Sequence, residues 1–183
     1  MSDRKPVIDP PKPFSRRVPE GDNRERMICD DCGFISYENP KIVVGSVIAW
    51  GDKIVLAKRA IHPRKDHWTL PAGFMEMHET TEEGAVREAW EEACARIEIV
   101  TLLAIYNIPR ISQVQMMYVA KLLSPDIAAG PESSAVGLYT WDDIPWDNLA
   151  FPSVLWALRH YRQVRGLASF VPFGNPPDDT LSR

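Results

Sequence analysis

The sequence has little cysteine and no long apolar run. Its three cysteines, Cys29, Cys32 and Cys94, are spread over 183 residues, unlike the dense and even set of a secreted disulfide scaffold. No segment has the unbroken apolar run of a membrane helix, and residues 1–26 carry prolines and charges where a signal peptide has an apolar core. We therefore expect a cytoplasmic chain with no membrane partner.

Positive charge is also scarce. Lysine and arginine number 21 against 25 aspartates and glutamates, which gives a net charge of -4. This balance does not attract a polyanion, so we expect no nucleic-acid partner. A small anionic substrate would need help from a few arginines or a bound cation. The length allows one good core, or one core with a small appendage.

Turn and cap signals divide the chain into strands and helices. Gly51 and Asp52 separate two β-branched runs, which is the signal of a short hairpin. Thr80 stands three residues before Glu83, the spacing of a capping box at the start of a helix. Pro152 suits the first turn of another helix. We expect strands over residues 41–50, 53–58, 97–106, 114–123 and 136–141, and helices over 80–94 and 152–164.

Both ends of the chain lack a helical or strand period. We therefore expect residues 1–27 to form a loosely held arm, with regular structure starting near Met27. We expect three parts: an N-terminal arm with a degenerate zinc-ribbon-like segment over 1–38, the main domain over 39–166, and an irregular tail over 167–183.

Three carboxylates share one face of the predicted helix over 80–94. Glu88, Glu91 and Glu92 stand at i, i+3 and i+4, and such like charges repel by roughly 1 kcal/mol per close pair in water. Their oxygens suit a hard cation such as Mg²⁺, which substrate phosphates often help to coordinate. A solvated face with an Arg87–Glu91 pair is the alternative. The buried stripe is expected to comprise Ala85, Val86, Ala89, Trp90 and Ala93.

The spacing around these carboxylates is specific. The segment over 73–95 reads GFMEMHETTEEGAVREAWEEACA, and it resembles the Nudix hydrolase signature G-x5-E-x7-R-E-U-x-E-E-x-G-U, in which U is aliphatic. The resemblance implies the Nudix fold, an α+β protein of the α/β/α sandwich type, with a mixed sheet between helices and here a small N-terminal ribbon-like segment. It also implies a loop-helix-loop that holds divalent metal against a diphosphate.

The resemblance assigns metal ligands residue by residue. Glu88 and Glu92 become the principal ligands of Mg²⁺ or Mn²⁺, and Glu91 becomes a further or water-mediated ligand. A backbone carbonyl at or beside Ala72 and Gly73 is expected to join them. The ion would neutralise phosphate charge and lower the pKa of an attacking water, with a glutamate of the signature as the base.

Other site residues follow from the same resemblance. Arg87 and Glu79 are expected to form a structural ion pair between helix and loop. A base outside the signature is predicted at Glu132, although Ala135 stands where an acid was expected. Arg59 is the predicted phosphate-binding residue, and Tyr106 is one candidate for stacking on a base.

Two positions depart from the signature. Cys94 occupies the closing glycine position, and Ala95 is smaller than the usual aliphatic residue. Glycine there permits a left-handed helix ending, so the cysteine predicts a helix that continues or ends differently.

Cys29 and Cys32 form half of a zinc ribbon. A tetrahedral structural zinc needs four sulfur or nitrogen ligands, and no second C-x-x-C occurs upstream, so we expect no zinc. The run CDDCGFISYENPKIVVG, with the signature and the later AGPESSAVGLYTW, resembles a Nudix subgroup that carries an N-terminal zinc ribbon. That subgroup is associated with hydrolysis of ADP-ribose and FAD.

The sequence therefore predicts a Nudix pyrophosphohydrolase that cuts ADP-ribose or FAD and releases AMP. One alternative is NADH pyrophosphatase, whose relatives carry an SQPWPFPxS array that this sequence lacks. The other is a non-catalytic, nucleotide-sensing Nudix module, which the intact REAWEE and the lack of a basic cluster disfavour. A homodimer is an expectation of the resemblance alone.

Overall fold

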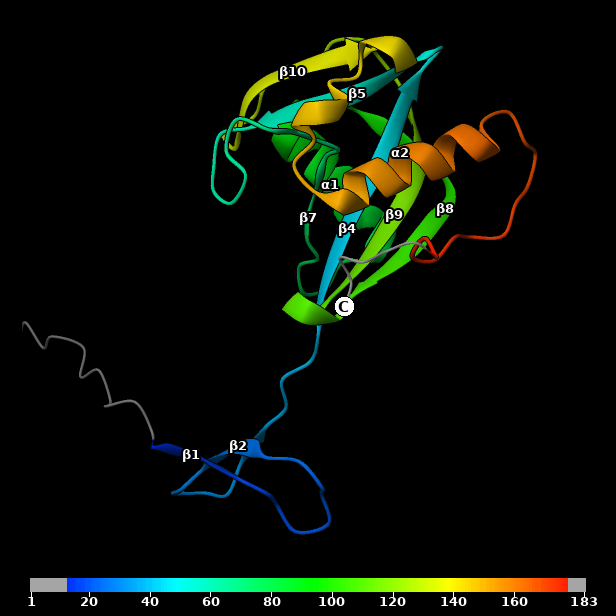
Figure 1. The fold of residues 1–183 in the computed structure, drawn as a ribbon. Helices are drawn as coiled ribbons and strands as arrows, with labels where there is room; N and C mark the ends of the chain where they lie inside the picture. Colours follow the sequence, from blue (N-terminus) through cyan, green and yellow to red (C-terminus); the bar gives the residue numbers. More distant parts are fainter. Residues whose placement is uncertain (1–12, 178–183) are drawn as a thin grey trace, which may run out of the picture. The chain divides into compact units, whose positions relative to one another are not determined.

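The structure is a computed structural model that describes residues 13–177. The chain forms two compact units that divide between Asn39 and Pro40. The first unit is a small antiparallel sheet of β1 (Phe14–Arg17), β2 (Arg26–Cys29) and β3 (Ile35–Ser36), in the order β1-β2-β3 (Figure 1). Strand β1 lies in the segment predicted to be an arm, so the prediction that structure starts near Met27 is wrong. The side chains of β1 are mostly exposed, and the strand forms through backbone pairing with β2 although its sequence has no apolar pattern.

The second unit contains a mixed sheet. Its main strands follow the order β10-β5-β4-β9-β8, with β6 paired to β5 and β7 paired to β4. The β4–β9 pair is parallel and the other pairs are antiparallel, which confirms the predicted mixed sheet. The strands are β4 (Lys41–Trp50), β5 (Lys53–Arg59), β6 (Trp68–Thr69), β7 (Ala72–Phe74), β8 (Ile97–Ile108), β9 (Gln113–Leu122) and β10 (Ser133–Tyr139).

One helix covers each face of this sheet, as Figure 1 shows: α1 (Thr81–Ala93) on one side and α2 (Pro152–Val164) on the other. Side chains alternate between the faces of a strand, so Val44 and Ile48 of β4 pack with α1 while Val47 packs with α2. The architecture is the predicted α/β/α sandwich. None of the helices in the described residues is long and apolar enough to span a membrane.

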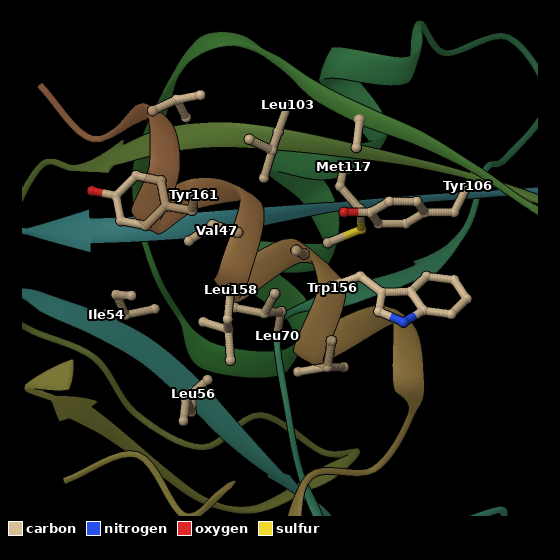
Figure 2. Close-up of a cluster of buried hydrophobic side chains, with 14 of the residues drawn as sticks. Val47, Ile54, Leu56, Leu70, Leu103, Tyr106, Met117, Trp156, Leu158 and Tyr161 are labelled. Carbon is tan, nitrogen blue, oxygen red and sulfur yellow. The ribbon is translucent and has the colours of Figure 1, made fainter. Parts of the chain in front are cut away.

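The larger core lies between α2 and the sheet. Figure 2 shows Trp156, Leu158 and Tyr161 of α2 among strand side chains that include Val47 and Leu103. Full burial of one such aliphatic side chain contributes roughly 1.5–3 kcal/mol. Tyr106 is fully buried here, and its hydroxyl lies 2.7 Å from Nδ1 of His160, so the prediction that Tyr106 could stack on a substrate base is wrong.

Three 3-10 turns and an irregular tail complete the second unit. The turns are η1 (Pro109–Ile111), η2 (Trp141–Asp143) and η3 (Trp146–Asn148). Beyond Gly166 the described chain is irregular except at Phe173, which forms a bridge with Ala104 of β8. The Ile105 N–H donates to the Phe173 carbonyl at 2.9 Å, and the Phe173 ring stacks on His160 with centroids 4.1 Å apart.

Candidate active site

Helix α1 begins with a capping box. The Glu83 N–H donates to the Thr80 hydroxyl at 3.1 Å, and the Thr80 N–H donates to the Glu83 carboxylate at 2.7 Å. These reciprocal bonds satisfy two backbone donors that a helix start otherwise leaves free. The predicted start of the helix is therefore confirmed, and the turn that leads into it is fixed.

The sheet-facing side of α1 consists of alanines and glutamates. Ala85, Ala89 and Ala93 are fully buried, as predicted. Val86 and Trp90 are 38% and 49% exposed, so the prediction that they belong to the buried stripe is wrong. In their place the buried residues include Glu88 at 8% exposure and Glu92 at 7%. Two carboxylates thus enter the sheltered side of the helix.

Arg87 joins the helix to the preceding loop. Its Nη2 lies 2.8 Å from Glu79 Oε1, its Nε donates to Glu79 Oε2 at 3.0 Å, and Nη2 also donates to the Phe74 carbonyl at 3.0 Å. A two-bond grip of this kind fixes orientation as well as distance. The arginine lowers the pKa of Glu79 to about 2. The pair predicted from the sequence forms, and it holds the loop on the helix.

The same guanidinium also meets two of the three predicted metal ligands. Arg87 Nη1 lies 2.7 Å from Glu88 Oε1 and 2.9 Å from Glu91 Oε2. Glu92 is not among its partners in the described chain. Arg87 therefore compensates part of the negative charge on this face. It does not form an ion pair with the Glu92 carboxylate.

Glu92 lies against strand β7. Its Oε2 accepts the Ala72 N–H at 3.2 Å, and burial raises the pKa of Glu92 to about 8, with the charges of Glu88 and Glu132 adding to the rise and that of Arg59 opposing it. Burial also raises the pKa of Glu88, although Arg87 opposes this.

Gly73 follows Ala72 in β7, next to the Glu88 carboxylate. A side-chain carbon at Gly73 would overlap that carboxylate and displace it from its place beside the loop. The first residue of the signature therefore leaves room for a buried carboxylate.

The loop before β10 packs on the C-terminal end of α1. The Gly130 N–H donates to the Glu92 carbonyl at 3.1 Å, and a side-chain carbon at Gly130 would overlap the Glu91 carbonyl oxygen. The Glu132 carbonyl accepts the Ala60 N–H at 2.8 Å, next to Arg59. The structure thus brings Glu132 and Arg59 within electrostatic range of Glu92. Sequence reasoning missed Gly130, because no local pattern indicates its contact with α1.

The metal ligands remain a prediction. Within residues 13–177, no group of three or more His, Cys, Asp or Glu side chains is arranged to hold a metal ion, and Glu88 and Glu91 contact Arg87. The donor chemistry nevertheless fits a hard divalent cation. Glu88 and Glu92 are buried carboxylates, and burial of such groups favours either a proton or a nearby cation.

Cys94 ends helix α1 in the left-handed conformation, with φ 47° and ψ 28°. Its N–H donates to the Trp90 carbonyl at 2.8 Å, which is the bond of the αL motif, and the Ala95 N–H donates to the Ala89 carbonyl at 3.1 Å. The prediction of a different ending is therefore wrong. The cysteine adopts the geometry that glycine prefers, because the backbone bonds of the motif outweigh the strain.

Replacing Cys94 by glycine should therefore stabilise the protein. A left-handed residue with a side chain costs roughly 1–2 kcal/mol, so we expect Cys94→Gly to raise the free energy of unfolding by about 1 kcal/mol. Urea denaturation followed by circular dichroism measures this. Cys94→Ala is the control, because it removes the thiol and keeps the strained Cβ. Equal stability of the two variants would contradict the strain argument.

Cys29 and Cys32 lie in the first unit. Cys29 is buried and Cys32 is exposed, and both are free thiols. Backbone N–H groups of Cys32 and Asp31 hydrogen-bond to the Cys29 sulfur and lower its pKa. Residues 1–39 contain no histidine and no further cysteine, so the two cysteine sulfurs are the zinc ligands that this unit offers from sulfur or imidazole groups. They fall short of the four ligands of a structural zinc, and the absence of zinc stays a prediction.

Comparison with known proteins assigns the family. The family model described as NUDIX domain matches residues 39–157. The chain belongs to the Nudix hydrolase family. A second family model, described as Nudix N-terminal and named for a zinc ribbon, matches residues 12–38. Both parts of the predicted resemblance are thus confirmed, and the chain is a Nudix pyrophosphohydrolase.

Individual relatives of this Nudix chain carry different names. A crystal structure of a NUDIX hydrolase from Nitrosomonas europaea is 46% identical with a TM-score of 0.83, and the match covers 88% of this chain and 93% of that one. The ADP-ribose pyrophosphatase of Methanocaldococcus jannaschii is 30% identical over 63% of this chain and 69% of its own length. The NAD-capped RNA hydrolase NudC of Escherichia coli is 30% identical over 65% of this chain, but the chain spans only 46% of NudC.

Proposed function

We propose that the protein hydrolyses the pyrophosphate bond of a nucleoside diphosphate linked to a second group, with ADP-ribose or FAD as the substrate. The observation that carries this proposal is the burial of the Glu88 and Glu92 carboxylates on one side of α1, where the charges of Arg59 and Glu132 also act on Glu92. A dense set of carboxylates with an arginine whose terminal nitrogens are not bound to them suits a diphosphate that arrives with a divalent cation. The similarity to an ADP-ribose pyrophosphatase supports the substrate class.

Each residue of the site has a distinct task in this proposal. Glu88 and Glu92 hold Mg²⁺ or Mn²⁺, with Glu91 and the Ala72 carbonyl as further ligands. The chemistry that the ion supplies is neutralisation of phosphate charge and a lower pKa for the attacking water. The water oxygen bonds to phosphorus while the anhydride P–O bond breaks, and a carboxylate of the signature or Glu132 accepts the proton.

The products depend on the substrate. ADP-ribose gives AMP and a ribose phosphate, and FAD gives AMP and FMN. Arg59 binds a phosphate oxygen in either case. We assign a small nucleotide as the partner of this site, and neither nucleic acid nor a membrane enters the proposal.

NADH pyrophosphatase activity is the second candidate. It is favoured by the similarity to NudC over the Nudix portion. A nucleotide-sensing module remains the non-catalytic alternative, and the intact set of Glu88, Glu91 and Glu92 favours catalysis over sensing.

A substrate screen tests the proposal. Purified protein with Mg²⁺ or Mn²⁺ is given ADP-ribose, FAD, NADH, nucleoside triphosphates, sugar nucleotides and capped nucleotides, and phosphate is measured after a phosphatase step. We expect the highest kcat/KM on ADP-ribose or FAD, with AMP as a product. Preference for NADH would support the second candidate. Binding of nucleotides without turnover of any would overturn the assignment of an enzyme.

A further inference from the structure

Arg59 is held by two contacts that leave part of its guanidinium free. Its Cζ lies 5.2 Å from the centre of the Phe151 ring, and its Nε donates to the Pro63 carbonyl at 2.8 Å. Within residues 13–177, neither terminal nitrogen of Arg59 has a hydrogen bond or ion pair. The positive charge nevertheless reaches Glu92, whose pKa it lowers against the effect of burial. Arg59 therefore presents two terminal nitrogens, with no partner among the described residues, near the carboxylates.

Phe151 occupies an unusual position for an aromatic residue. It is the N-cap of α2, with φ -138° and ψ 149°, and its side chain makes no capping hydrogen bond. Serine, threonine, aspartate and asparagine are favoured at this position because their oxygens accept a free backbone N–H. Phenylalanine gives up that bond, and its ring instead lies against the Arg59 guanidinium.

One short segment sets the relative position of the two residues. On one side, Arg59 N–H donates to the His67 carbonyl and the Asp66 N–H donates to the Arg59 carbonyl, both at 2.9 Å. On the other side, the Ala150 N–H, next to Phe151, donates to the Trp68 carbonyl at 2.8 Å. Residues 66–68 thus tie the end of β5 to the start of α2. These backbone hydrogen bonds hold the main chain at Arg59 close to the main chain at Phe151, independently of the contact between the two side chains.

We propose that Phe151 is a positioning residue that orients Arg59 so that its two terminal nitrogens bind the diphosphate of the substrate. The ring face attracts the guanidinium and excludes side-chain rotamers that would turn the fork away. The Pro63 carbonyl fixes the third nitrogen, so that the two terminal nitrogens remain for bidentate binding of phosphate oxygens. This inference rests on the proposed function, because it assigns a task within that site.

A purely structural role for Phe151 predicts different behaviour. The ring also packs against the core cluster under α2, so its loss would lower stability in any case. A structural role would change the melting temperature and leave the affinity of the folded protein for phosphate unchanged. A positioning role changes that affinity, and the change depends on Arg59.

Binding of inorganic pyrophosphate in the presence of Mg²⁺, measured by calorimetry, tests the inference. We expect Phe151→Leu to weaken binding about three- to tenfold, the range of a contact of about 0.7–1.4 kcal/mol, and Phe151→Tyr to retain it. Phe170→Leu is the matched control, since Phe170 packs on the same cluster, and it should bind as the wild type does. In catalysis, Phe151→Leu should raise KM while kcat stays within about twofold.

A double variant decides whether Phe151 acts through Arg59. The Arg59→Lys/Phe151→Leu protein should bind pyrophosphate no more weakly than Arg59→Lys alone, because the ring then has no guanidinium to orient. Additive losses, unchanged binding in Phe151→Leu, or no pyrophosphate binding by the wild type would each overturn the inference. If the wild type cleaves none of the nucleotides but the pyrophosphate pattern holds, the proposed activity fails and the positioning role stands.

Discussion

Replacement of Glu92 by glutamine is expected to lower kcat by about 10²–10³-fold or more without unfolding the protein. Glutamine has nearly the same shape, and its carbonyl can still accept the Ala72 N–H that Glu92 accepts at 3.2 Å. What disappears is a buried negative charge that would hold the divalent ion. Steady-state kinetics on the best substrate of the screen measure the loss, and circular dichroism checks the fold.

Glu98→Gln is the matched control for this variant. Glu98 is exposed on β8, and the same chemical change there should leave kcat within about twofold of the wild type. Wild-type turnover in purified Glu92→Gln protein would show that the buried carboxylate is not a metal ligand.

The pH dependence of metal binding is the second large effect. Without metal, burial raises the pKa of Glu92 to about 8, so the folded protein holds a proton there that the unfolded chain loses near the ordinary glutamate value of 4.5. Metal must displace this proton, and Mn²⁺ affinity should rise with pH by up to about tenfold per unit until about pH 8. Calorimetric titration between pH 6 and 9 measures the slope.

The same linkage has the opposite sign for the stability of the metal-free protein. Between pH 4.5 and about 8 the folded state binds more protons at Glu92 than the unfolded state does, so stability falls as pH rises through this range. Glu92→Gln should flatten both pH dependences. A Mn²⁺ affinity that does not change between pH 6 and 8 would contradict the assignment of Glu92 as a protonated, metal-binding carboxylate.

Local sequence signals were sufficient for much of α1. Thr80 and Glu83 set the start of the helix within one turn of chain, and the spacing of Glu88 and Glu92 placed both on the same side. The inner face was predicted less well, because hydrophobicity alone favours Trp90 over a glutamate. A side-chain carbon at Gly84 would lie 2.8 Å from Val44, so the helix approaches the sheet closely and only small residues fit between them. Bulky side chains are therefore displaced outward.

Contacts between distant segments were not predictable from local patterns. Gly130 meets the end of α1, and its role depends on the path of a whole loop. Strand β1 forms through backbone pairing with β2, which leaves no apolar alternation in the sequence. The left-handed conformation of Cys94 accompanies the backbone hydrogen bonds that Cys94 and Ala95 donate to Trp90 and Ala89, and these bonds outweigh the preference of the residue.

The bridge between Phe173 and β8 has a consequence for self-association. Strand β8 is the last in the sheet order, and an outermost strand offers free backbone groups on which another polypeptide can assemble. The backbone of Phe173 forms hydrogen bonds with Leu103 and Ile105 on the free edge of β8. We therefore expect a chain cut before Phe173 to expose these backbone groups of β8 and to aggregate more readily through intermolecular β-structure.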